Sequence, residues 1–186
     1  MLLLLAGAVL LLLSACSAKT GSTANQKTAE VGAGMGGPQM TVHISPQAIN
    51  TKPKPPDLST PQSAVRSYLD WVSYAYRIGQ SDVASPTMGP DENVRVDAYV
   101  QYNFQSKKLL DQQLMSVTFG KPSTGATSTT VPASEKWTYH YSSIEQGNKT
   151  LGGPYAASYD TVYTVIHTKS GWQVYSVKAT PRGAVK

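Results

Sequence analysis

The sequence predicts an α+β domain in which two amphipathic helices pack on a curled antiparallel sheet of four strands. Apolar residues recur every three or four positions between about residues 61 and 104, which is the period of one helix face. After about residue 110 they alternate with polar residues in segments rich in Thr, Val, Trp and Tyr, as is typical of strands. Helices followed by strands indicate the α+β class, and we expect this domain to cover residues 60–186.

Capping residues mark the start of the first helix. Thr60 is a suitable N-cap, and Pro61 occupies the first helical position, where its missing N–H costs nothing. Gly79 can end this helix, and the dipeptide Ser85-Pro86 marks a boundary beyond it. The apolar stripe between these limits consists of Ala64, Val65, Tyr68, Leu69, Trp71, Val72, Ala75, Tyr76 and Ile78.

A second helix is expected to begin at Pro90. Asp91 and Glu92 would lie in its first turn and Lys107 and Lys108 near its last, which is the charge order that the helix dipole favours. Residues at four-residue spacing form its apolar row, namely Val96, Val100 and Phe104.

Four strands are expected to follow. The first lies near residues 114–119, where Met115, Val117 and Phe119 alternate with other residues. The second covers about residues 127–142, the third about residues 155–168, and the fourth residues 172–179 after a tight turn at Ser170-Gly171. Consecutive strands joined by turns predict an antiparallel meander.

This order of elements, over about 125 residues, resembles the cone-shaped NTF2-like fold. Three features carry the resemblance: the opening helix with its Tyr and Trp residues, the long second strand, and the closing hairpin, whose pattern runs from Tyr159-x-Thr161-x-Tyr163-x-Val165 to Trp172-x-Val174. A cystatin-like arrangement of a helix on a sheet is the alternative. The NTF2-like resemblance implies a small molecule held in the mouth of the cone, and in the enzymes of that superfamily a carboxylate or histidine acting there as acid or base.

Aromatic residues with polar tips dominate the predicted strands. The chain has 11 Tyr and 3 Trp but only 2 Phe, a composition that suits partly hydrated binding surfaces. Alternation places Glu135, Trp137 and Tyr139 on one face of the second strand, and Tyr159 and Tyr163 on one face of the third. These five residues are the candidate ligand-binding residues, with Glu135 as the candidate general base if the domain is an enzyme. We favour the other interpretation, in which Glu135 lies in water at a strand end and Trp137 and Tyr139 are ordinary core.

The first 15 residues are expected to be a lipoprotein signal peptide. Residues 2–13 form an apolar run that is too short to span a bilayer, which takes about 20 residues, but suits a signal peptide. The sequence Leu13-Ser14-Ala15-Cys16 resembles the lipobox of bacterial lipoproteins. The resemblance implies cleavage before Cys16, diacylglycerol on its sulfur, and a protein held outside the cytoplasmic membrane. A secretory signal with an incidental cysteine is the alternative.

Residues 16–59 are expected to be the lipidated cysteine and a flexible linker. They are rich in Ser, Thr, Gly, Ala, Pro, Lys and Gln, and cannot bury enough apolar surface to offset the entropy of ordering. Residues 40–44 alternate between apolar and polar types. They could form an edge strand or bind a partner, but we favour an incidental apolar patch in a coil.

Composition excludes several functional classes. The net charge of +5 favours weak contact with anionic headgroups or wall polymers, but no Lys/Arg run exceeds two residues, so nucleic acid is not an expected partner. A single cysteine cannot form an intramolecular disulfide or a cysteine-based zinc site. The three histidines lack the spacing of a metal site, and no phosphate-binding loop or serine-nucleophile motif occurs. We therefore expect no metal and no cofactor.

These observations favour a non-enzymatic, lipid-anchored, extracytoplasmic binding or interaction domain of the bacterial envelope. Its partners would be the membrane, through the anchor, and an envelope protein, a peptide or a glycan. The alternative is a small-molecule enzyme of the cyclase or isomerase type with Glu135 as general base. In a third interpretation the cone is solid core and the outer face of the sheet packs on a partner protein.

Overall fold

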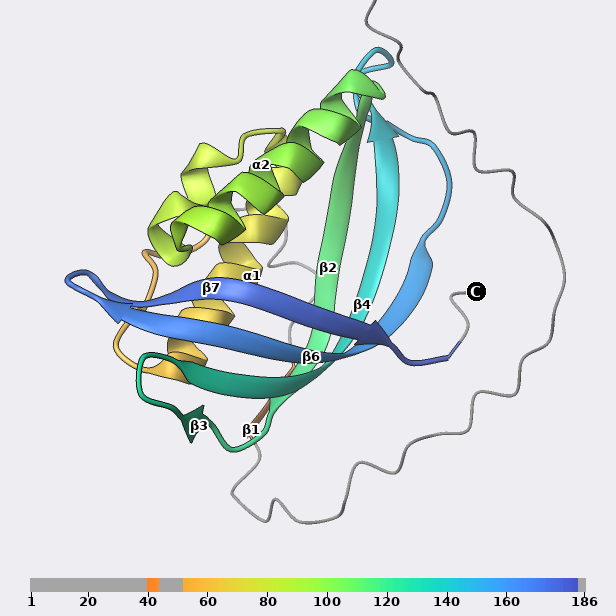
Figure 1. Ribbon diagram of the computed structural model, residues 1–186. Helices are drawn as coiled ribbons and strands as arrows, with labels where there is room; N and C mark the ends of the chain where they lie inside the picture. Colours follow the sequence, from red (N-terminus) through yellow and green to blue (C-terminus); the bar gives the residue numbers. More distant parts are fainter. Residues whose placement is uncertain (1–39, 44–51, 184–186) are drawn as a thin grey trace, which may run out of the picture. The chain divides into compact units, whose positions relative to one another are not determined.

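A computed structural model describes residues 40–43 and 52–183 of the chain. Its elements are β1 (Met40–His43), α1 (Pro61–Ile78), the 3₁₀ helix η2 (Asp82–Thr87), α2 (Pro90–Gln105), β2 (Lys108–Phe119), β3 (Ser123–Thr124), β4 (Thr129–Ser143), β5 (Lys149–Thr150), β6 (Tyr155–Thr168) and β7 (Gly171–Pro181). Figure 1 shows both α-helices on the same side of the sheet, which is the α+β arrangement that the sequence predicts.

The first helix has the predicted limits because its capping signals are local. The Thr60 hydroxyl accepts a hydrogen bond from the Ser63 backbone N–H at 3.1 Å, and the Ser63 side chain accepts one from the Thr60 N–H at 3.0 Å. This reciprocal pair is a capping box. At the other end Gly79 adopts φ 70°, a left-handed conformation in which glycine avoids the strain of a side chain. The buried stripe of α1 includes Val65, Leu69 and Val72 of the predicted apolar face.

The second helix begins at Pro90 as predicted but ends earlier than expected. It stops at Gln105, and the chain reverses through Lys107, which has φ 57°. Lys108 is therefore the first residue of β2, and both lysines, expected near the last helical turn, lie just beyond the end of the helix. The expected apolar row is only partly buried, because Val96 and Val100 are inside while Phe104 is 51% exposed.

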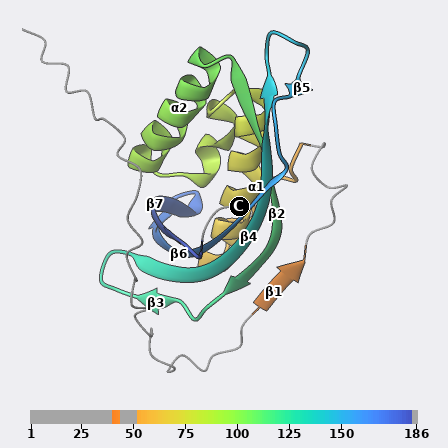
Figure 2. The ribbon, with the colours of Figure 1, turned by 90° about the vertical axis from the view of Figure 1, so that its right-hand side faces the viewer.

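The described strands form one seven-stranded sheet with a central order of β1, β2, β4, β6 and β7, and all of these neighbours pair antiparallel. The two short strands β3 and β5 both pair with β4. The four strands predicted from the sequence correspond to β2, β4, β6 and β7, so the expected count of four is too low. Figure 2 shows β4 bending along its length, and this bend curls the sheet around α1.

A β-bulge explains why β2 is longer than the strand predicted there. In β2 the pairing with β4 shifts between Leu114, which faces Trp137, and Ser116, which faces Lys136. Met115 is the extra residue, so the buried positions change from even to odd numbers at this point. Leu110 and Leu114 are buried before the bulge, and Val117 and Phe119 are buried after it. The change of parity hides the period-two pattern on which strand prediction depends.

Segments of the predicted linker also join the folded part. Residues 40–43 form the edge strand β1 on β2, so the interpretation of an incidental patch in a coil is wrong. Residues 53–58 pack beside α1 and the β6–β7 turn, where the Trp71 indole N–H donates to the Lys54 carbonyl at 3.1 Å and the Trp172 N–H to the Leu58 carbonyl at 2.9 Å. Gly171 (φ 110°) permits this approach, since a Cβ there would lie 2.6 Å from the Leu58 oxygen.

The core lies between α1, α2 and the concave face of the sheet. Residues of both helices and four strands share one cluster, which includes Val65, Val72, Val96, Val117, Phe119, Val131, Tyr163, Val165 and Val174. Of the helices in the described part of the chain, none combines the length and apolarity that a membrane crossing requires.

Candidate functional site

A cavity of about 330 Å³ lies between α1, α2 and the strands, beside the core. Both helices and β2, β4, β6 and β7 contribute side chains to its wall. Eight of its 18 lining residues are aromatic, namely Tyr68, Tyr76, Tyr99, Trp137, Tyr139, Tyr141, Tyr159 and Tyr163. Tyrosine presents an apolar ring and a polar tip, so this lining can contact an apolar ligand and hydrogen-bond to it.

All five residues predicted to bind a ligand line this one cavity. Glu135, Trp137 and Tyr139 come from alternate positions of β4, whose side chains share a face. Tyr159 lies opposite Glu135 in the antiparallel register of β4 and β6, and Tyr163 lies four residues further along β6. The alternation that predicted each strand face and the pairing of the two strands together bring these side chains to one site.

Glu135 is a buried carboxylate with its own hydrogen-bond donors. Its side chain is 5% exposed, so the expectation that it lies in water at a strand end is wrong. Oε2 accepts a hydrogen bond from the Trp137 indole at 2.8 Å, and Oε1 accepts one from the Tyr163 hydroxyl. Burial raises the pKa of Glu135, and the hydrogen bonds from Tyr163 and Trp137 oppose that rise because they favour the charged form.

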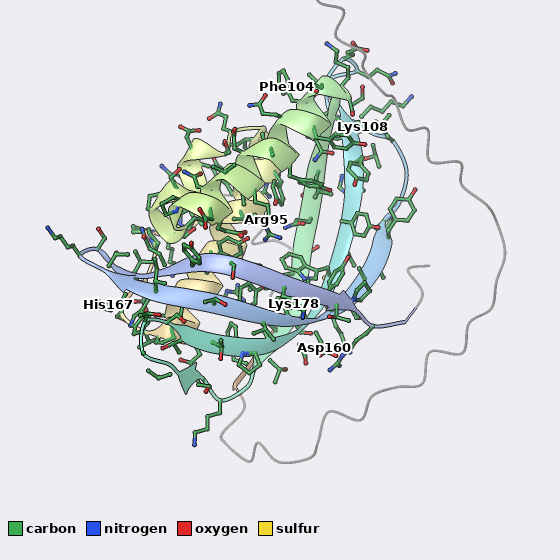
Figure 3. All side chains as sticks on the ribbon, viewed as in Figure 1. Arg95, Phe104, Lys108, Asp160, His167 and Lys178 are labelled. Carbon is green, nitrogen blue, oxygen red and sulfur yellow. The ribbon has the colours of Figure 1, made fainter. Side chains whose placement is uncertain are left out.

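A second buried carboxylate, Glu92, lies at the start of α2 and is paired with a cation. Arg95 donates to it from Nε at 3.0 Å and from Nη2 at 2.6 Å, and the Tyr68 hydroxyl also donates to it. The Glu92 side chain is 2% exposed, whereas Arg95 is 57% exposed and lines the cavity. Figure 3 shows Arg95 beneath α2, facing the space between this helix and the strands. The charge of Glu92 is thus neutralised locally, and that of Glu135 is not.

Two tyrosines connect these acidic groups. The rings of Tyr68 and Tyr163 meet edge to face, with centroids 6.0 Å apart. Burial, and then the charge of the adjacent carboxylate, raise the pKa of each hydroxyl well above its ordinary value. Both hydroxyls therefore keep their protons at neutral pH and serve as donors to Glu92 and Glu135. The result is a fixed polar wall on one side of an otherwise aromatic cavity.

Sequence reasoning missed the contribution of the helices to this site. It places Tyr68 and Tyr76 in the apolar stripe of α1 and relates Glu92 to the helix dipole, but all three are part of the cavity or its polar wall. The spacing of Glu92 and Arg95, three residues apart on a helix, was an available signal for an ion pair. Cys16, the predicted lipidation site, lies outside the described residues.

Metal-binding geometry does not occur in the described part of the chain, where no three His, Cys, Asp or Glu side chains gather to hold an ion. His140 lies 3.6 Å from Asp111 on the neighbouring strand, and His167 packs edge to face on Trp172 with centroids 5.0 Å apart. Neither histidine lines the cavity. Among its lining residues Glu135 is the acidic group and Arg95 the basic group, and Glu92 lies behind the wall, bonded to Tyr68 and Arg95.

Comparisons with known proteins concern the fold. No protein-family model and no curated protein matches the sequence. The structure is similar to the intermembrane-space region of the chloroplast protein ARC6, with a TM-score of 0.56 and 17% identity over 70% of this chain and 100% of that one. A putative calcium/calmodulin-dependent protein kinase II association domain from Xanthomonas campestris matches at a TM-score of 0.41 and 10% identity, over 73% of this chain and 97% of that one, a level too low to carry an argument. The ARC6 likeness supports the α+β arrangement of helices on an antiparallel sheet.

Proposed function

We propose that the chain is a lipid-anchored, extracytoplasmic binding domain of the bacterial cell envelope, built on an NTF2-like fold. It holds a small molecule, or a side chain or sugar of a larger partner, in the tyrosine-lined cavity. The single observation that carries this proposal is the cavity itself. Its volume of about 330 Å³ lies in the range of small-molecule sites, and its lining combines aromatic rings with polar groups that can fix the orientation of a ligand.

The state of Glu135 favours binding over catalysis. Each of its oxygens already accepts a hydrogen bond from a neighbouring side chain, so the carboxyl group is held in one position. A group fixed in this way shapes a site and presents its remaining lone pairs to a ligand. Because no cation among the described residues pairs with it, it also favours ligands that carry a hydrogen-bond donor or a positive charge.

Capture from detergent-solubilised membranes, with the full chain as bait, tests whether the cavity binds. Ala179 lines the cavity and is exposed, so Ala179→Trp fills the site without disturbing the core. Ser176 on the same strand is exposed and does not line the cavity, so Ser176→Trp is the matched control. We expect a protein or small molecule that is retained by the wild type and the control and lost with Ala179→Trp. Equal retention by all three would contradict binding in the cavity.

The anchor has a separate test. The lipobox-like sequence that ends at Cys16 supports lipidation, and two or three acyl chains give stable anchoring at about 0.8 kcal/mol per buried CH₂. Mass spectrometry of the mature N-terminal peptide should show acyl groups on Cys16, and Cys16→Ser should release the protein from membranes. A wild-type protein that is soluble and has a free thiol would refute the anchor and leave the cavity proposal intact.

The alternative function is a small-molecule enzyme of the cyclase or isomerase type, with Glu135 as general base. The raised pKa of Glu135 favours it, because a base works best when its pKa lies near the operating pH. Glu135→Gln preserves the shape of the site but cannot accept a proton. Loss of turnover of a captured small molecule, with its affinity retained, would support the enzyme. If neither the wild type nor Glu135→Gln converts the captured small molecule, the result would argue against an enzyme.

A further inference from the structure

A second hollow, distinct from the tyrosine-lined cavity, lies on the other side of α1. We call it the basic groove. It has a volume of about 450 Å³ and is bounded by residues 52–57, by α1, and by residues 112–114 of β2. The Trp71 ring forms part of its wall, and the Trp71 indole N–H bonds to the Lys54 carbonyl that borders it.

Positive charge predominates in the basic groove. Four basic side chains line it, against two acidic ones, Asp57 and Asp70. Asp70 is already paired with Arg66, which donates to it from Nε at 3.1 Å and from Nη2 at 3.0 Å. Asp57 accepts hydrogen bonds from the backbone and hydroxyl of Ser59. Within the described residues, no salt bridge compensates the remaining basic residues of the groove, which are Lys52, Lys54 and Arg77.

Unsatisfied donors accompany this charge. Nη1 of Arg66, Nη1 of Arg77 and Nε2 of Gln113 are buried and have no hydrogen-bond partner in the described part of the chain, and all three residues line the groove. Each buried donor without a partner costs about 1–3 kcal/mol, and most such groups in folded proteins are satisfied. These three atoms are closed off from the hollow, so an acceptor inside it would contact the other atoms of these side chains and the ammonium groups of Lys52 and Lys54.

The neighbours of Arg77 leave it available to that acceptor. Its guanidinium lies over the Tyr74 ring, 5.6 Å from the centroid. This cation–π contact attracts the charge of Arg77 but gives its N–H groups no oxygen acceptor. Asp111 is the acidic group that acts on Arg77 through space, and Asp111 itself lies 3.6 Å from His140 on β4. A guanidinium keeps its charge in proteins, so Arg77 remains a cation in the wall of the groove.

We propose that the basic groove binds a phosphate group carried by a small organic molecule or by a lipid headgroup. The donors come from guanidinium, amide and ammonium groups, and they outnumber what the two oxygens of one carboxylate can accept. A phosphate monoester offers three strong acceptor oxygens and up to two negative charges, and arginine binds it in a forked geometry. The volume of about 450 Å³ exceeds that of phosphate alone, which leaves room for the organic part.

Trp71 provides a local reporter for the test. In ¹⁵N spectra of the full chain in maltoside micelles, which contain no phosphate, its indole resonance is assigned with Trp71→Phe. The Trp137 indole, which donates to Glu135 in the other cavity, is the internal control. The chain is titrated with inorganic phosphate, with glycerol 3-phosphate and with short-chain phosphatidic acid, which are all phosphates with at least three free oxygens, each against sodium chloride at equal ionic strength.

We expect a saturable shift of the Trp71 resonance with little movement of Trp137. Arg77→Gln should weaken the apparent affinity at least tenfold, since it removes a charge and keeps a similar volume. Lys178→Gln removes one charge from an exposed position of β7 that does not line the groove, and should change affinity less than twofold. If Arg77→Gln fails to fold, Lys54→Gln replaces it, because Lys54 is exposed.

The same titrations show whether the phosphate belongs to a free ligand or to a lipid headgroup. Saturation by glycerol 3-phosphate supports a free ligand, and saturation by the phosphatidyl compound alone supports a headgroup. The proposal is overturned if no phosphate compound shifts the Trp71 resonance more than chloride does. It is also overturned if Arg77→Gln and Lys178→Gln weaken binding equally, because the net charge of the protein alone would then explain the binding.

Discussion

The tyrosine-lined cavity and the basic groove lie on different sides of α1 and differ in how their charged groups are paired. In the cavity each buried carboxyl group has its own donors: Trp137 and Tyr163 for Glu135, Tyr68 and Arg95 for Glu92. In the groove, buried donors of Arg66, Arg77 and Gln113 have no acceptor among the described residues. A closed network stabilises the fold and offers a rigid shape, whereas the unpaired cations around the groove can attract an anionic ligand.

The ion pair of the cavity should give the largest effect on stability. Arg95→Met leaves Glu92, 2% exposed, buried without a counter-charge, and we expect a loss of about 3 kcal/mol in the free energy of unfolding. Urea denaturation measures this loss. The double variant Glu92→Gln, Arg95→Met removes the buried charge and should recover most of it. A loss below about 1 kcal/mol for Arg95→Met would contradict a closed network in the cavity.

Loss of a hydrogen bond to Glu135 should have the next largest effect on the free energy of unfolding. Tyr163→Phe removes the hydroxyl that donates to Oε1 of Glu135 and leaves a buried acceptor unpaired, at a cost of about 1–3 kcal/mol. Tyr102→Phe is the control, because Tyr102 is 66% exposed and its loss of a hydroxyl should change stability by no more than about 0.5 kcal/mol. Equal effects of the two substitutions in thermal or urea unfolding would argue that Glu135 is solvated.

Glu135 should also make stability depend on pH. Its pKa is raised in the folded protein by burial, so between the ordinary carboxyl pKa and the raised value the folded state binds more protons than the unfolded state. Stability is therefore greatest below that window and falls as pH rises through it, by about 1.4 kcal/mol for each pH unit that the window spans. Unfolding free energies at several pH values should show that Glu135→Gln removes this fall. A wild-type profile parallel to that of Glu135→Gln would contradict the raised pKa.

A substitution in the groove should have the smallest effect on stability. It should lower stability slightly and strengthen phosphate binding. Arg66 and Asp70 are an i, i+4 pair with side chains 23% and 40% exposed, so Asp70→Asn should cost less than about 1 kcal/mol. The same substitution removes a negative charge from the groove wall and frees Arg66, and we expect it to tighten binding of inorganic phosphate. Calorimetric unfolding and the Trp71 titration measure the two effects. Weaker phosphate binding by a stable Asp70→Asn protein would count against the groove as a phosphate site.

Local patterns were sufficient for much of this fold. The limits of α1 follow from Thr60, Pro61 and Gly79, which lie next to the turns that they cap. The common face of Glu135, Trp137 and Tyr139 follows from the period of a strand, and so does that of Tyr159 and Tyr163. Five of the residues that line the cavity could therefore be named in advance.

Long-range contacts decided the rest. The sequence by itself determined the α+β order, the start of both helices and the strand faces, because capping and side-chain alternation act within a few residues. Only the tertiary structure decided that Met115 forms a bulge, that residues 53–58 pack on Trp71 and Trp172, and that Glu92 is buried against Tyr68. The tyrosine-lined cavity and the basic groove both arise between elements distant in the chain. Their burial and charge depend on how α1 packs on the curled sheet, and no local period encodes that packing.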